Sequence, residues 1–247
     1  MRNINNKFPI IVNIKNIEEA LIAEKNGADA LLLLDEIPKE IIEMEVSGPQ
    51  FKLSVVKELL KVINIPLFVR VRIGNLNEIK ILETVGINSF YEINIVKTKT
   101  KIEYAFKDPK NTYITEGNDL QSIIKRISDG FQIITISSKN IETTLNKLVN
   151  IYNEIKKISL FNTEKLDKYC QYNNISDEIV KKITINKKFP CSLFISNIAE
   201  LNDINIFKDY KCLINLIDGF FIENEYFSID HLSELELFRS SLSKIKL

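Results

Sequence analysis

The sequence contains few glycines and a single histidine. Only seven of its 247 residues are glycine. Phosphate-binding enzymes use glycine where the backbone must approach phosphate oxygens, so this number is low for a protein that handles phosphorylated sugars. His231 is the only histidine, so a Ser-His-Asp triad would have to be built around it, and a multi-histidine metal site has no second histidine. The sequence therefore predicts a structural role for His231, no metal site and no cofactor.

Cysteine, excess charge and long apolar runs are equally scarce. The three cysteines, Cys170, Cys191 and Cys212, are odd in number and far apart, which fits a reduced intracellular chain without a zinc site. Lys and Arg balance Asp and Glu at 33 each, which argues against a nucleic-acid or anionic-membrane partner. No apolar run reaches transmembrane length, and residues 1–7 do not resemble a signal peptide. We expect a cytoplasmic protein with no nucleic-acid and no membrane partner.

Strand-like and helix-like segments alternate along the whole chain. Apolar residues make up 45% of it, enough for one large core. Eight short, apolar segments read as buried parallel strands, at 9–14, 28–34, 66–71, 88–95, 112–115, 131–136, 191–195 and 218–222. Segments with helical spacing lie at 17–26, 51–63, 75–85, 120–129, 140–158, 164–172, 176–185 and 227–242. This order predicts one α/β domain over residues 1–247, a closed (β/α)8 TIM barrel.

Several stretches together resemble one known family. They are Val12 to Ala28 (with Ala-Leu-Ile-Ala-Glu-Lys-Asn-Gly-Ala), Val69 to Gly74 (Val-Arg-Val-Arg-Ile-Gly), and Leu120 to Gly130 (ending Lys-Arg-Ile-Ser-Asp-Gly). Weaker support comes from Phe189-Pro190 and from Asp218-Gly-Phe-Phe-Ile222. The chain is similar to the PdxS/SNZ family, the synthase subunit of glutamine-dependent pyridoxal 5'-phosphate synthase. The resemblance implies a TIM barrel from vitamin B6 biosynthesis that assembles into rings.

The positions that carry the family's chemistry hold other residues here. The resemblance places a first-strand aspartate at Asn13, an imine-forming lysine at Arg70, a fourth-strand aspartate at Tyr91 and a second lysine at Ser137. A guanidinium has no free amine lone pair, and a carboxamide cannot act as a base at neutral pH. Lys139, two residues after Ser137, is expected in a loop. We therefore predict that no catalytic residue of the family remains.

The family's phosphate-binding loops are also altered. The resemblance places them at Ser138, Asn197 and Glu223-Asn224-Glu225. Two carboxylates near a phosphate repel it, and each pair of like charges about 4 Å apart costs roughly 4 kcal/mol at an effective dielectric near 20. We expect no sugar-phosphate binding at these residues.

Three hypotheses about function follow from these observations. In the first, the chain is a catalytically inactive PdxS-like subunit, a homo-oligomer or a hetero-oligomer that serves an active paralogue as scaffold or regulator. A glutaminase partner is doubtful, because the family's N-terminal segment and C-terminal tail have no counterpart in this sequence. In the second, the chain is an active PdxS-like or other barrel enzyme that acts on a different anionic metabolite through Arg70, Tyr91 and Glu92, and Arg72 could assist.

The third hypothesis is an unrelated phosphate-binding barrel, such as a thiazole synthase or an indole-glycerol-phosphate-like enzyme. No glycine pair stands at the ends of the last two predicted strands. This absence argues against the third hypothesis, because such barrels hold phosphate with glycine-rich backbone at those ends.

Overall fold

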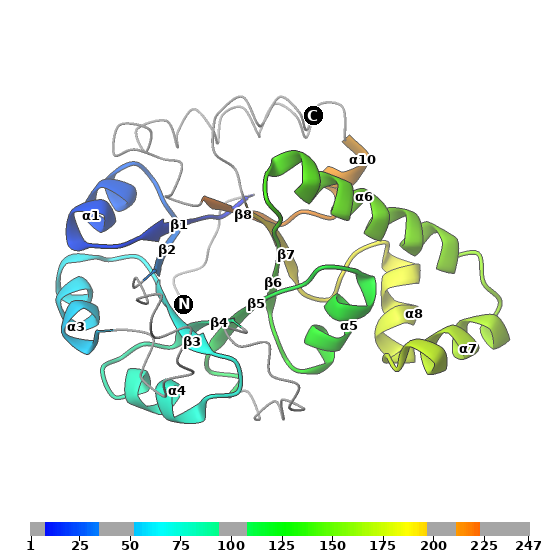
Figure 1. Cartoon of the computed structure of the whole chain (residues 1–247), viewed down its shortest axis with the longest axis horizontal. Helices are drawn as coiled ribbons and strands as arrows, with labels where there is room; N and C mark the ends of the chain where they lie inside the picture. The colour runs from blue at the N-terminus through cyan, green and yellow to red at the C-terminus, as the bar shows by residue number, and fades with distance from the viewer. Residues whose placement is uncertain (1–7, 35–51, 94–107, 197–210, 223–247) are drawn as a thin grey trace.

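The protein is a closed barrel of eight parallel strands surrounded by helices (Figure 1). The computed structural model describes residues 8–34, 52–93, 108–196 and 211–222. The strands are β1 (Ile10–Ile14), β2 (Ala30–Leu33), β3 (Leu67–Arg72), β4 (Ser89–Ile93), β5 (Thr112–Glu116), β6 (Ile133–Ile136), β7 (Ser192–Ile195) and β8 (Gly219–Ile222). The helices are α1 (Ile17–Lys25), α3 (Leu53–Val62), α4 (Leu76–Glu83), α5 (Leu120–Ser128), α6 (Ile141–Ile158), α7 (Thr163–Asn173), α8 (Asp177–Asn186) and α10 (Lys211–Ile214).

Each strand pairs in parallel with the next strand in the sequence, and β8 closes the ring on β1. Ile10 lies opposite Phe220 and Val12 opposite Ile222 across this closing pair. The architecture confirms the predicted TIM barrel. Figure 1 shows the helix pair α7 and α8 beside α5 and α6, outside the ring of strands. This pair follows α6 between β6 and β7 in the sequence, where helical spacing was predicted at 164–172 and 176–185.

Alternate residues of each strand enter two different apolar layers. On β1, Ile10, Val12 and Ile14 pack in the layer between the strands and the helices. Ile11 packs in the barrel interior with residues such as Phe68 and Phe221. Both faces of every strand are therefore covered, which explains why the strands read as continuous apolar runs in the sequence.

A row of aromatic rings crosses the barrel interior. The ring centroids of Phe194 and Phe221 are 6.0 Å apart, and those of Phe221 and Tyr91 are 5.8 Å apart. Gly219 makes room for this row, because a Cβ atom at its position would lie 2.4 Å from the Phe194 ring. The glycine at the start of β8 is thus a packing requirement of the interior.

The residues that begin and end the helices are largely those predicted from the sequence. Asn16 begins α1 by accepting the backbone N–H of Glu19 at 2.9 Å, and Gly27 follows α1 with a φ of 91°. Element boundaries agree within a few residues of the prediction. The predicted helix at 227–242 and His231 lie outside the described residues, and α10 was not predicted. Within the described ranges, no helix has both the length and the apolar character that a membrane span needs.

Candidate functional site

A cavity of about 430 Å³ lies at the carboxyl ends of the barrel strands. Active sites of TIM barrels form at this end, since the loops that follow the strands converge there. Asn13 from β1, Arg70 from β3, Tyr91 from β4, Thr135 from β6 and Phe221 from β8 all line the cavity. The structure thus brings together, in one space, three of the positions singled out in the sequence, namely Asn13, Arg70 and Tyr91.

Arg70 reaches the cavity because its strand neighbours face outward. Val69 and Val71 are buried in the layer between strands and helices, so the alternation of β3 turns Arg70 inward. Arg70 lies opposite Tyr91 in the register of β3 and β4. Its guanidinium supplies positive charge and N–H donors to the cavity, and it supplies no nucleophilic amine.

Asn13 is a buried polar residue with an unsatisfied acceptor. Only 5% of its surface is exposed, and its Oδ1 atom is buried and accepts no hydrogen bond from the described residues. A carboxamide at this place can accept or donate a hydrogen bond, but it cannot take up a proton as an aspartate could.

Tyr91 and Glu116 form a hydrogen bond at the wall of the cavity. The Tyr91 hydroxyl donates to Glu116 Oε1 at 2.9 Å, and the Tyr91 ring packs against Phe221. Glu116 is the last residue of β5 and is exposed. An aromatic ring therefore occupies the place to which the family resemblance assigns a carboxylate.

Glu92 borders the cavity, but its carboxylate supports the loop after β3. The residue is fully buried, and its Oε2 atom accepts the backbone N–H of Gly74 at 3.1 Å. Glu92 also acts on Arg126 of α5. Burial lowers the pKa of the Arg126 guanidinium, and the carboxylates of Asp129 and Glu92 oppose this shift. Glu92 thus serves as an internal counter-charge.

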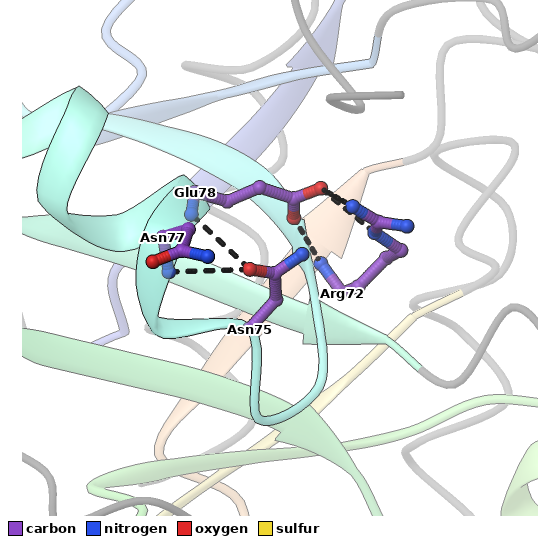
Figure 2. Close-up of polar contacts among 4 residues, drawn as sticks. All are labelled: Arg72, Asn75, Asn77 and Glu78. Carbon is purple, nitrogen blue, oxygen red and sulfur yellow. Dashed lines mark hydrogen bonds and ion pairs between the residues drawn. The ribbon is translucent and has the colours of Figure 1, made fainter. Parts of the chain in front are cut away.

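Arg72 does not join Arg70 at the cavity, because Glu78 holds it (Figure 2). The backbone N–H and the Nε of Arg72 each donate to the Glu78 carboxylate at 2.8 Å, and Nη2 lies 2.7 Å from Oε1. Glu78 is in turn held at the start of α4, where Asn75 Oδ1 accepts the N–H groups of Asn77 and Glu78. The predicted assistance of Arg72 in anion binding is therefore wrong for this geometry.

The end of β6 holds a lysine contact that the sequence did not predict. Ser137 follows β6 and is half-buried, and Lys139 is exposed in the loop beyond it, as expected. Lys147 of α6 donates from Nζ to the Ser137 carbonyl oxygen at 2.6 Å and to Asn118 Oδ1 at 2.9 Å. The sequence did hold a signal for this contact. Lys147 lies seven residues after the helix cap Asn140, and residues seven apart share one helix face.

The predicted phosphate loops are mostly outside the described residues. This is so for Asn197 and for Glu223, Asn224 and Glu225. Ser138 is described and is half-buried in the loop after β6. The cavity described here is accordingly the inner part of the site, formed by the strands and by the first residues after them.

The closed barrel with a polar cavity at the carboxyl ends of its strands places the protein among the (β/α)8 barrels. Within that class, the SOR/SNZ family model matches residues 4–196, and the chain belongs to this family. The resemblance noted in the sequence is thereby confirmed.

Three similar curated proteins carry the name "Pyridoxal 5'-phosphate synthase subunit PdxS". The protein from Clostridium botulinum (strain Langeland) is 24% identical over 230 residues, which cover 91% of this chain and 78% of the relative. The protein from Caldanaerobacter subterraneus subsp. tengcongensis is 26% identical over 189 residues, 74% of this chain and 65% of the relative. The protein from Staphylococcus aureus (strain JH9) is 23% identical over 190 residues, with shares of 74% and 64%.

Proposed function

We propose that the chain is a catalytically inactive member of the PdxS family, whose relatives are named for pyridoxal 5'-phosphate synthesis and thus for vitamin B6 biosynthesis. The observation that carries the proposal is Arg70. It lies on β3, lines the cavity, and stands where the family resemblance requires the imine-forming lysine. A guanidinium stays protonated at any physiological pH, so Arg70 cannot attack a carbonyl carbon.

The other cavity residues support the same conclusion. Among the described residues that line the cavity, none is a lysine. The amine of Lys147 is close to the end of β6, where it donates to the Ser137 carbonyl oxygen and to Asn118 Oδ1. Asn13 and Tyr91 stand where the resemblance places carboxylates on the first and fourth strands, which supports the loss of general-base chemistry at these two positions.

Covalent trapping tests the loss of catalysis. The purified chain is incubated with ribose 5-phosphate, reduced with borohydride and weighed as the intact protein. We expect no added mass, whereas an adduct in the unmodified chain would refute the proposal. Lys147→Gln is the matched variant, because loss of an adduct in it would locate a returned amine on α6. Arg70→Lys is the positive variant, which restores an amine at the strand and makes an adduct possible there.

We further propose that the inactive subunit assembles with copies of itself or with an active PdxS-type paralogue, as scaffold or regulator. The closed barrel supports this proposal, because assembly into a ring depends on the scaffold of the subunit and not on its catalytic groups. Co-expression with an active paralogue, followed by sizing and mass measurement of the complexes, tests the assembly. Mixed species are expected, and exclusively separate species would contradict it.

The second candidate is a barrel enzyme for another anionic metabolite, acting through Arg70, Tyr91 and Glu92. The observation in its favour is that all three residues line the cavity. Tyr91 and Glu92 are, however, engaged by Glu116 and by the N–H of Gly74. A thermal-shift screen with carboxylates and phosphorylated sugars, followed by a search for turnover of any ligand found, separates this candidate from the first.

We propose a cytoplasmic setting for either function. Cys170, Cys191 and Cys212 are all free in the structure. Burial raises the pKa of the Cys170 and Cys191 thiols, which keeps them protonated and slow to oxidise. Free thiols are the usual state in reducing compartments.

A further inference from the structure

The cavity at the carboxyl ends of the strands has two unlike walls. Apolar residues line it from β8, from β2 and from the residue after β2, namely Phe221, Leu32 and Leu34. From β5, β6 and β7 and the loops directly after β5 and β7, the described lining residues are all polar, namely Thr115, Glu116, Asn118, Thr135 and Ser196. Since β2 and β6 lie on opposite sides of the closed ring of strands, the apolar wall faces the polar wall across the cavity.

Thr135 gives the polar wall a hydroxyl group that is not used within the described part of the chain. Its strand neighbours Ile134 and Ile136 pack in the layer between the strands and the helices, so the alternation of β6 turns Thr135 inward. Only 1% of its surface is exposed, and its hydroxyl makes no hydrogen bond with the described residues. Such a buried hydroxyl is unfavourable unless water or a ligand satisfies it.

Glu116 and Asn118 extend this set of polar groups. Glu116 lies opposite Thr135 in the register of β5 and β6. Its Oε1 atom accepts from Tyr91, and its Oε2 atom accepts no hydrogen bond from the described residues. Lys147 donates to Asn118 Oδ1 at 2.9 Å, which orients the amide and leaves its two N–H groups as donors. A hydroxyl, a carboxylate oxygen and an amide on adjacent strand ends suit neighbouring hydroxyl groups of a ligand, because each hydroxyl both donates and accepts.

The charges of the described lining balance. Two guanidinium groups, of Arg70 and Arg126, and two carboxylates, of Glu92 and Glu116, border the cavity. An ionic ligand would lose its hydration there without meeting an excess of the opposite charge. The carboxylate of Glu116 also repels a phosphate or a carboxylate at the polar wall. The cavity therefore favours a neutral ligand with one hydroxylated side and one apolar side.

We propose that the cavity binds a neutral monosaccharide, a pentose or hexose without a phosphate group, and holds it without a covalent bond. Its hydroxyls bind Thr135, Glu116 and Asn118, and its C–H groups pack against Leu32 and Phe221. The volume of about 430 Å³ accommodates a molecule of this size. The inference rests on the proposed loss of imine chemistry, because an amine in the cavity would react with the open-chain aldehyde of the sugar.

Ligand-observed NMR titration of the full chain with D-ribose and D-glucose tests the proposal. Ribose 5-phosphate and glucose 6-phosphate are the matched ligands, since each adds only a charged group to the same sugar. We expect at least one neutral sugar to bind, and to bind ~5-fold or more tightly than its own phosphate. No binding of either neutral sugar at roughly 50 mM, or phosphates that bind as tightly as the sugars, would overturn the proposal.

Substitutions of Thr135 assign the hydroxyl contact. Thr135→Val keeps the shape of the side chain and removes the hydroxyl, and it is expected to weaken sugar binding by ~5-fold or more. Thr135→Ser keeps the hydroxyl and should retain most of the affinity. Thr163→Val, the same change on an exposed residue of α7, is the control and should bind like the unmodified chain. Melting temperatures confirm folding, and unchanged affinity in folded Thr135→Val would refute the contact.

Glu116→Gln separates the charge of this residue from its shape. The amide keeps an oxygen acceptor but carries no charge, so the preference for the neutral sugar over its phosphate should shrink by ~3-fold or more. A loss of packing alone would weaken both ligands equally. An unchanged preference in the folded variant would refute the role given to Glu116.

The two proposals fail in different experiments. An adduct with ribose 5-phosphate after borohydride reduction refutes the loss of catalysis. Absence of sugar binding together with absence of an adduct refutes the ligand assignment and leaves the inactive subunit in place.

Discussion

The ammonium of Lys147 on α6 donates to the backbone carbonyl of Ser137 at the end of β6, with a distance of 2.6 Å. The same Nζ atom reaches Asn118 Oδ1 in the loop after β5. One side chain thus ties a helix to two neighbouring strand ends at the rim of the cavity. Ser137 stands where the family resemblance places a lysine. The amine of Lys147, from α6, contacts this position through the backbone carbonyl of Ser137.

Replacing Lys147 by methionine should destabilise the barrel. The change keeps the apolar stem of the side chain but removes both hydrogen bonds, and a half-buried ammonium that bonds two acceptors contributes about 1–3 kcal/mol. We expect the free energy of unfolding, measured by urea titration, to fall by about this amount. Lys139→Met, on an exposed loop residue, is the control and should change it by less than about 0.5 kcal/mol. Equal effects of the two substitutions would contradict the role given to Lys147.

Replacing Glu78 by alanine should loosen the loop after β3. Glu78 accepts from the backbone and the guanidinium of Arg72 and is almost fully buried. Because Arg72 keeps about a quarter of its side chain exposed, solvent screens part of the interaction, and we expect a loss of about 2–3 kcal/mol. The matched control is Glu164→Ala in the exposed pair with Lys168, for which about 0.5 kcal/mol or less is expected. Chemical denaturation of both variants checks the difference.

Replacing Gly219 by alanine should strain the interior. The added Cβ atom would lie 2.4 Å from the Phe194 ring, and overpacking of this kind costs about 1–3 kcal/mol. Shortening Phe194 to leucine in the same chain should recover part of the loss, since the smaller side chain leaves room for the methyl group. Melting temperatures of the two single variants and the double variant form the test. Strictly additive effects would show that the two residues do not press on each other.

The thiol of Cys191 should react slowly with alkylating reagents, and its titration should lower the free energy of unfolding at alkaline pH. Burial raises the pKa of this thiol from 9.0 to about 12, and the charge of Asp218 adds to the shift. Because the pKa of the thiol is higher in the folded than in the unfolded chain, its contribution to the free energy of unfolding is complete below the unfolded-state pKa of 9.0. This contribution is lost as the pH rises toward 12. Between pH 9 and 10, the unfolding free energy should fall less steeply in Cys191→Ala than in the unmodified chain.

Iodoacetamide labelling of the native protein at pH 8 gives a second measurement on the same thiols. Cys212 is exposed and should be alkylated first, because the thiolate is the reacting form and burial suppresses it at Cys170 and Cys191. Alkylation of Cys191 as fast as Cys212 would contradict the burial of its thiol.

The sequence by itself determined the barrel. Apolar runs long enough for a strand but too short for a helix recur eight times, and most are followed by a segment with helical spacing, whose ends carry signals such as Asn16 and Gly130. These are local properties of the chain, set by side-chain periodicity and by backbone preferences, so they can be read without knowing what lies across the sheet. The sequence also specified that position 70 has no nucleophilic amine, since the identity of a residue fixes its chemistry.

Only the tertiary structure decided which polar residues meet. Arg70 and Arg72 share a strand face in the sequence, yet Glu78 from the start of α4 holds Arg72 and leaves Arg70 at the cavity. For Glu92 the sequence offers an acid–base role as one alternative, and the structure adds that its carboxylate accepts the backbone N–H of Gly74. Such partners lie on different elements, and their pairing depends on strand register and helix placement, which no local pattern encodes.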